Sequence, residues 1–232
     1  MTTSSIPVDA LRLLVTQGFD ATSVDALAAA AGMSRSTFFR RFGSKEGMVF
    51  ADMERVIDSV SERLGERGRG PTADAVVRAA LGVFDHLTAD AERAELRHQL
   101  LSAVPALRDR ELVSTHRFES AFRHGLAEIF ERDPSTGIAY SAAVVGVHNY
   151  HLRRWLAAPG PAPRAALEAD VRRLSERYAD ALSPTGTTTS AGPSAHAGGA
   201  VVVAVADAGA DESAILDAVR AQLRAYGRGA SA

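Results

Sequence analysis

The stretch GMSRSTFFRRFGSKEG, residues 32–47, decides how the N-terminal part of this chain folds. It holds four of the 26 basic residues, among them Lys45, the only lysine of the chain. Ser34, followed by RSTFFRRF and then Gly43, is the pattern of a short helix with a serine N-cap and a glycine stop. The stretch therefore predicts a helix that ends before Gly43 and a further helix that begins after Ser44.

The residues before this stretch supply its partner helices. Apolar residues recur at helical spacing over 6–17, and Ser23 is a good N-cap for a second helix, VDALAAAA. The turn AGMS then joins this second helix to the third, which is the helix-turn-helix arrangement whose second helix enters the DNA major groove. Phe38 and Phe42 are four residues apart, so we expect them to face the core together, with Leu27 beneath them.

The other face of the third helix has residues suited to DNA. Arginine can bond bidentately to guanine, hydroxyls can reach bases or phosphates, and an aromatic ring can touch a thymine methyl. This face carries Arg35, Ser36, Phe39 and Arg40. Lys45 lies in the first turn of the next helix, where free N–H groups already favour an anion and an ammonium adds a charge for a phosphate. The alternative is an ordinary solvated face.

Composition restricts the remaining classes of function. The chain has no cysteine, which excludes disulfides and thiol catalysis and fits a reducing cytosol. Its first residues have no basic segment or long apolar run, so we expect neither a signal peptide nor a membrane span, and a cytoplasmic location. The net charge is −2, but a DNA-binding protein needs its basic residues in one place, not an overall excess.

Beyond the short stretch the pattern stays helical and predicts an all-α fold of about nine helices. The later helices are expected at 44–64, 72–89, 91–103, 106–131, 137–158 and 163–182. The composition of 184–199, rich in Ser, Thr, Gly and Pro, predicts a flexible linker. Residues 200–232 contain AVVVAVA and an amphipathic run, which predict either a strand-helix appendage or a disordered tail.

The segment GFDATSVDALAAAAGMSRSTFFRRFGSKEGM, residues 18–48, resembles the DNA-binding region of the TetR/AcrR family of regulators. The order of its elements carries the resemblance: Gly-Phe, Thr-Ser-Val, Ala-Gly-Met-Ser, Thr-Phe-Phe and Ser-Lys-Glu. The resemblance implies a helix-turn-helix domain at 1–48 and a helical ligand-binding and dimerisation domain at 49–183. The sequence departs from the family at Phe39, where tyrosine is usual, and at Thr16, where an aromatic residue is common.

The resemblance also implies which residues meet DNA. Ser23 and Lys45 are expected on phosphates, and the others lie at or near the operator. The expected DNA-binding set is Ser23, Ser34, Arg35, Ser36, Thr37, Phe39, Arg40, Arg41 and Lys45.

For the larger domain the resemblance implies a homodimer, a near-palindromic operator and a ligand pocket between the helices from 72 to 158. The expected pocket residues, each with ordinary core packing as its alternative, are Phe84, His98, Leu101, His116, Phe122, Tyr140 and Asn149. The segment 100–112 is similar to mycofactocin-associated regulators, some of which respond to long acyl-CoA molecules. The expected effector is therefore a small, largely apolar ligand, with acyl-CoA among the candidates.

Two features of the sequence agree with a dimer formed by the helices at 137–158 and 163–182. Small residues in the first helix permit close helix approach, and the second helix carries an apolar stripe that needs a partner. Packing within one chain is the alternative explanation for the stripe. The residues concerned are Ala142, Ala143 and Gly146 in the first helix, and Leu167, Val171, Leu174 and Tyr178 in the second.

The sequence lacks the patterns of an enzyme. His148 and His151 stand at i and i+3, but no HExxH pattern, Gly-x-Ser-x-Gly elbow, phosphate loop or GxGxxG fingerprint occurs. We expect no catalytic residues, no metal and no cofactor. The sequence thus predicts a ligand-released repressor, with an activator or a DNA-associated protein without a switch as alternatives.

Overall fold

The computed structural model describes residues 6–65 and 72–182, and in these two ranges it is helical throughout, with no strand. The predicted all-α class is confirmed. The expected linker at 184–199 and strand-helix appendage at 200–232 lie outside the described residues. Within the described ranges, no helix combines the length and the apolar character that crossing a bilayer demands.

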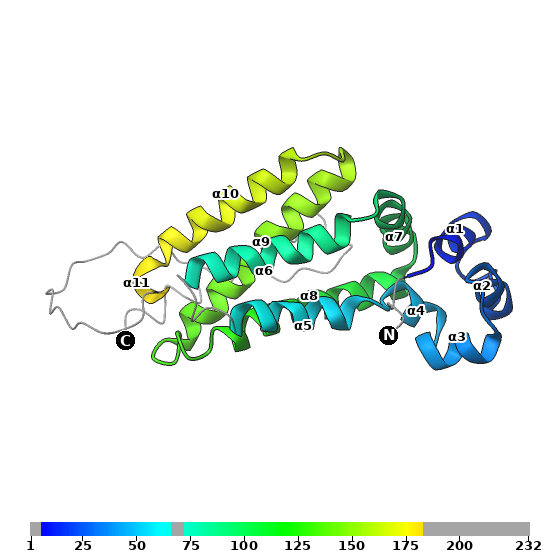
Figure 1. The fold of residues 1–232 in the computed structure, drawn as a ribbon, viewed down its shortest axis with the longest axis horizontal. Coiled ribbons are helices and arrows are strands. Elements are labelled where there is room, and N and C mark those ends of the chain that lie inside the picture. The colour runs from blue at the N-terminus through cyan, green and yellow to red at the C-terminus, as the bar shows by residue number, and fades with distance from the viewer. Residues whose placement is uncertain (1–5, 66–71, 183–232) are drawn as a thin grey trace, which may run out of the picture. The chain divides into compact units, whose positions relative to one another are not determined.

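The helices follow one another with short connections (Figure 1). They are α1 (Val8–Gln17), α2 (Val24–Ala30), α3 (Arg35–Phe42), α4 (Lys45–Val49), α5 (Met53–Gly65), α6 (Thr72–Thr88), α7 (Ala91–Ala103), α8 (Pro105–Gly125), α9 (Pro134–Ala157), α10 (Ala162–Arg177) and α11 (Ala179–Leu182).

Serine side chains set the starts of α2, α3 and α4, as predicted. Ser23, Ser34 and Ser44 each occupy the N-cap and accept a hydrogen bond from the backbone N–H three residues further on, at 3.0–3.2 Å. Each cap satisfies one of the N–H groups that a helix start leaves without a partner. The start of the third helix is therefore fixed by local chemistry.

Two glycines control how α3 is held. Gly32 in the turn before α3 has a φ of +66°, a conformation that residues with a side chain rarely adopt. Gly47 permits a close approach, because a Cβ there would lie 1.9 Å from the carbonyl oxygen of Phe42. The first turn of α4 therefore packs directly against the end of α3 and fixes its position from behind.

The structure divides two stretches that the sequence predicted as single helices. The stretch 44–64 is interrupted between α4 and α5, where Phe50 and Asp52 are both buried. The stretch 163–182 is interrupted at Tyr178, after which α11 places Leu182 in the core. The helix expected at 106–131 ends at Gly125, where a Cβ would lie 2.5 Å from Leu64. Tertiary packing decides all three breaks.

The buried residues form two clusters. The larger cluster joins α5, α6, α8, α9 and α10, with Tyr140 and Leu167 at zero exposure. The second, which we call the N-terminal core, is formed by α1–α4, and α7 contributes Leu96, Leu100 and Leu101 to it. The first four helices therefore share their core with a helix of the larger part.

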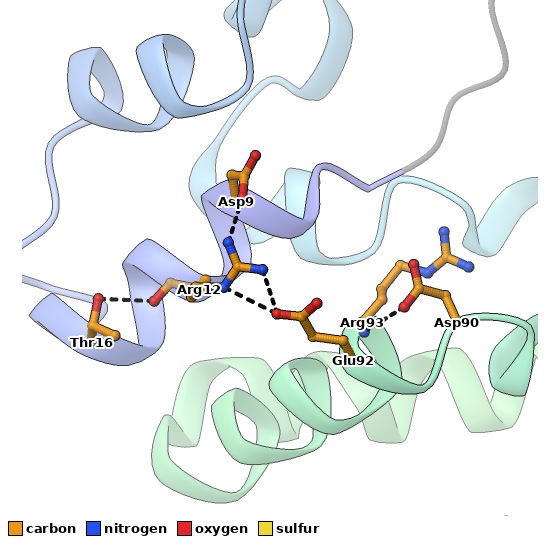
Figure 2. A network of polar contacts seen from close by, with 6 residues as sticks. All are labelled: Asp9, Arg12, Thr16, Asp90, Glu92 and Arg93. Atoms are coloured by element: carbon orange, nitrogen blue, oxygen red, sulfur yellow. Dashed lines mark hydrogen bonds and ion pairs between the residues drawn. The ribbon is translucent and has the colours of Figure 1, made fainter.

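Polar contacts reinforce the packing of α1 against α7 (Figure 2). Two nitrogens of Arg12 donate to Glu92 on α7, the Nε at 3.0 Å, and a third donates to Asp9 at 2.5 Å. Thr16, where the family commonly has an aromatic residue, donates to the carbonyl oxygen of Arg12 at 2.9 Å. These exposed ion pairs contribute little energy on their own, so apolar burial supplies most of the stability of the contact.

Phe38→Ala is expected to destabilise the chain by about 3–5 kcal/mol, since Phe38 is completely buried and its loss leaves a cavity in the N-terminal core. Phe39→Ala is the matched control, because Phe39 is 41% exposed one position away. Urea unfolding followed by circular dichroism measures both. Equal destabilisation by the two variants would contradict the assignment of the buried face.

Candidate DNA-binding surface and ligand pocket

The two faces of α3 have separate roles. Phe38 and Phe42 are 0% and 7% exposed and pack edge to face, with ring centroids 5.1 Å apart. On the other side Arg35, Phe39 and Arg40 are exposed. The predicted orientation of the helix is confirmed, and the face that lies opposite the core presents arginine, hydroxyl and aromatic groups together.

Contacts within the helix pair hold several of these groups in place. Arg35 donates to Asp25 of α2 at 2.8 Å, and its guanidinium lies 5.5 Å from the Phe39 ring centroid. Ser34 donates to the hydroxyl of Thr37 at 3.0 Å, and the hydroxyl of Ser36 lies 3.0 Å from that of Ser34. These contacts join the side chains at the start of α3 to one another and to α2.

The two later arginines of α3 differ in their surroundings. Arg41 places its guanidinium 5.1 Å from the Phe42 ring centroid. Arg40 is exposed and, within 6–65 and 72–182, makes no hydrogen bond or ion pair. Its guanidinium therefore keeps its full donor capacity for a base edge or a phosphate.

Lys45 faces the loop between α1 and α2. Its ammonium donates to the carbonyl oxygens of Phe19 at 2.7 Å and Thr22 at 3.2 Å, and lies 4.8 Å from the Phe19 ring centroid. Because Thr22 directly precedes the N-cap Ser23, the structure brings the two expected phosphate-binding residues to the same corner. The contacts with the loop are an additional role that the sequence did not indicate.

The sequence that forms α1–α4 matches a known domain. A family model described as bacterial regulatory proteins, tetR family, matches residues 8–51. The chain carries a TetR-family DNA-binding domain. The match covers α1–α4 and thus contains the whole helix-turn-helix pair and Lys45. No protein in a search of curated sequences matched the chain.

Solved structures of TetR-family regulators share the fold over most of the chain. Native NalD of Pseudomonas aeruginosa, described as the secondary repressor of the MexAB-OprM efflux pump, is 19% identical with a TM-score of 0.50, covering 76% of this chain and 94% of NalD. A TetR-family regulator from Rhodococcus sp. is 17% identical with a TM-score of 0.50, covering 73% of this chain and 96% of its own. FadR of Thermus thermophilus in complex with lauroyl-CoA is 15% identical with a TM-score of 0.50, covering 81% of this chain and 98% of FadR. At these identities the likeness shows the fold alone.

A cavity lies between α6, α7, α8 and α9, the four helices where the resemblance implied a ligand pocket. Three of the seven expected pocket residues line it: His98, Leu101 and Asn149. Its wall is mixed, with apolar residues such as Phe118 and Leu152 beside charged and polar ones. The cavity is thus less apolar than the expected ligand suggested.

The other four expected pocket residues lie elsewhere. Phe122 lines a smaller cavity next to the first, and Phe84 is a core residue at 1% exposure. Tyr140 is completely buried and bonds to the Ser175 hydroxyl at 2.7 Å, which joins α9 to α10 away from the cavity. The side chain of His116 is 76% exposed and so does not line either cavity. Helical spacing alone did not reveal which way these four residues point.

A charged cluster of Asp52, His86 and Arg97 forms part of the cavity wall. Asp52, between α4 and α5, lies 2.9 Å from His86 Nε2 at the end of α6. Arg97 of α7 lies 3.5 Å from the Asp52 Oδ1, within ion-pair distance but without making a hydrogen bond. Burial raises the pKa of Asp52, but the hydrogen bond with His86 and the charge of Arg97 outweigh this and lower it overall. The cluster therefore connects the α4–α5 connection to α6 and α7 through one buried carboxylate.

His148 of α9 is the second buried polar group at the cavity. It is 7% exposed, and burial lowers its pKa to about 4, so the ring is neutral at pH 7. Its Nδ1 lies 3.3 Å from the amide oxygen of Asn149, while Nε2 has no hydrogen-bond partner among the described residues. His151, three residues on, instead meets Asp170 of α10 at 2.9 Å. The two histidines thus have different environments.

Sequence reasoning missed Asp52, Arg97 and His148 as pocket residues. Asp52 carried a usable signal, because it is an acidic residue within the apolar run MVFADM and so had to be buried with a partner. Arg97 had no such signal among many arginines. His148 was noticed only as one of a histidine pair, since its burial depends on packing against α6 and α8.

The outer surface of α9 carries an apolar stripe. Ile138, Ala142, Gly146 and Tyr150 recur every fourth residue, and Ile138 and Tyr150 are 52% and 56% exposed. The expected stripe on α10 differs, because Leu167 and Val171 are buried in the core of the same chain and Leu174 packs against them. Packing within one chain, the alternative explanation, therefore accounts for the α10 stripe.

Asp52→Asn is expected to lower the free energy of unfolding at pH 7 by about 3 kcal/mol, since Arg97 would stay buried without its counter-charge. The exposed Asp109→Asn serves as control. Because the pKa of Asp52 is lower in the folded chain, its stabilisation is complete above the unfolded pKa of about 4 and is lost as the pH falls through the folded value. Urea unfolding between pH 7 and pH 3 should therefore show the two chains converging in acid; a constant difference would contradict the assignment.

Proposed function

We propose that the chain is a homodimeric transcriptional repressor that leaves a near-palindromic DNA operator when a small, largely apolar ligand binds. The observation that carries the proposal is the exposed face of α3, on which arginines, hydroxyls and Phe39 lie together within a TetR-family DNA-binding domain. DNA as the partner places the protein in the cytoplasm. No catalytic step is part of the proposal.

In the proposed complex the residues of α3 divide the work of recognition. Arg40, with its unengaged guanidinium, reads a base edge, and Phe39 contacts a thymine methyl, which needs no hydroxyl. Arg35 and Arg41 contact the sugar-phosphate backbone of the DNA, together with the hydroxyls of Ser34, Ser36 and Thr37. Ser23 and Lys45 bind phosphates at the corner that they share.

The exposed stripe on α9 supports the dimer. Ile138 and Tyr150 present apolar area, and the small residues Ala142 and Gly146 between them allow a second helix to come close. Two copies of α9 and α10 would then form a four-helix bundle with two-fold symmetry. That symmetry is the reason for proposing an operator with two related half-sites.

The shared helix α7 supports the coupling between ligand and DNA. It places Arg97 and Leu101 in the wall of the cavity and Leu96 and Leu100 in the N-terminal core. A ligand that moves α7 must therefore move α1, which packs on it, and with it the α2–α3 pair. We propose that ligand binding favours a state in which the two α3 helices no longer match successive major grooves.

Two other functions differ from this proposal in one respect each. An activator would bind the same operator with the opposite effect on transcription, and a DNA-associated protein without a switch would bind DNA and ignore ligands. Acyl-CoA esters belong in the ligand panel, because the similar FadR structure contains lauroyl-CoA. Transcription in a reconstituted system separates repressor from activator.

The experiment that tests the proposal is fluorescence anisotropy of the DNA upstream of this protein's own gene, titrated with the full chain and then with ligands. Tight binding that a scrambled duplex does not show, released by one chemical class, is the expected result. Specific binding that no acyl-CoA, fatty acid, alcohol or hydrophobic cation releases would contradict the ligand switch. Absence of any specific binding would contradict the operator.

Arg40→Ala is expected to weaken binding to the operator by about 1–3 kcal/mol, because a bidentate contact with a base is lost. Binding to the scrambled duplex should change much less. The exposed Arg78→Ala on α6 is the control for a simple loss of positive charge. Equal effects of Arg40→Ala on the two duplexes would assign Arg40 to the backbone instead.

Lys45→Ala is expected to weaken binding to all DNA sequences and to reduce the slope of log K against log salt by about one unit, as for the loss of one phosphate contact. Melting of the free variant measures its contacts with Phe19 and Thr22 separately. A lower melting temperature with an unaltered salt slope would leave Lys45 as a structural residue only.

A further inference from the structure

The imidazole of His148 is a buried polar group that the proposed function does not yet use. Its Nδ1 faces the amide oxygen of Asn149, so the proton of the neutral ring lies on Nδ1. The lone pair then lies on Nε2, which is buried and has no partner among the described residues. A buried acceptor without a donor is unfavourable, and such groups in proteins usually have a specific reason.

The position of His148 gives that reason. The main cavity and the smaller one beside it have three lining residues in common: Phe118, His148 and Asn149. The smaller cavity is otherwise lined by apolar side chains, including Val83, Phe122 and Val145. His148 therefore belongs to the walls of both cavities, and the main cavity, with its mixed wall, is the larger of the two.

The protonation state of the ring decides what it can bind. With its pKa lowered to about 4, His148 is neutral at pH 7, and with the proton on Nδ1 the Nε2 atom accepts a hydrogen bond. A carboxylate, an ether or a thioester carbonyl offers no hydrogen for it. A hydroxyl or an amide N–H does, and an uncharged group of this kind enters a buried cavity at far lower cost than an ion.

We propose that His148 determines the ligand specificity of the cavity by accepting a hydrogen bond at Nε2, and that the effector is an apolar molecule with an uncharged donor, such as a phenol or an alcohol. The proposal rests on the ligand-released repressor described above and names the chemical class of its ligand. The apolar part of the molecule lies in the main cavity, against Leu87, Phe118 and Leu152. A site built to bond such a donor rejects an analogue that lacks it, because its own buried acceptor then stays unpaired.

The test is a matched pair of probes, 4-propylphenol and 4-propylanisole, titrated calorimetrically into the full chain without DNA at pH 7.5. The two differ only in the methyl group that replaces the hydroxyl hydrogen. We expect the phenol to bind about tenfold more tightly. In His148→Leu that preference should fall to about one, whereas His148→Gln, which keeps an acceptor, should retain part of it.

His116→Leu is the matched control, since its exposed side chain lies outside both cavities and its preference should equal that of the unchanged chain. Circular dichroism melting verifies that each variant is folded, and His148→Phe, which also lacks an acceptor, replaces His148→Leu if that variant is not. Equal affinity for the two probes, tighter binding of the anisole, no binding of either, or a preference that persists in His148→Leu would overturn the proposal.

The same experiment separates this proposal from the function on which it rests. Calorimetry without DNA does not depend on an operator, so a phenol preference that needs His148 stands even if the DNA titration fails. Suppose instead that acyl-CoA or fatty acid releases the operator complex and the chain does not prefer the phenol to the anisole. The repressor then stands and the assignment of the ligand class is wrong.

Discussion

The burial of α7 against the first four helices is the constraint on which the rest of the structure depends. Leu96, Leu100 and Leu101 complete the N-terminal core, which α1–α4 alone do not close. The orientation of α3 is in turn fixed from inside by Phe38 and Phe42, and from behind by α4. The exposed face of α3 is therefore held in place through a helix whose other face lines the cavity.

The buried carboxylate of Asp52 also holds the first four helices against the helices that follow, through its charge. It lies where α4 passes into α5, and both His86 and Arg97 converge on it from the cavity side. A buried charge must keep its partners, so the end of the DNA-binding domain cannot shift far without disturbing α6 and α7. Apolar packing and this ion cluster thus constrain the same region, where α1–α4 meet α6 and α7.

Prediction from sequence succeeded where the signal was local. The serine caps, the Gly32 turn and the Phe38/Phe42 pair each depend on residues within one helical turn, and the structure has all three as expected. It was less complete for the long helices, because the breaks at Phe50 and Tyr178 depend on packing against core residues that are far away in the sequence. It was least complete for the cavity. Tyr140 and His116 stand in helices with the same apolar spacing as His98 and Leu101, but the first is buried in the core and the second is exposed.

The sequence by itself determined the helix-turn-helix pair, the buried and exposed faces of α3 and the all-α class, because capping, glycine turns and helical periodicity are properties of neighbouring residues. Only the tertiary structure decided that α7 belongs to two environments, that Lys45 also contacts the α1–α2 loop, and that His148 rather than His116 lies at the cavity. These facts depend on which helices meet and at what rotation. That is set by the packing of residues far apart in the chain, and no short-range pattern encodes it.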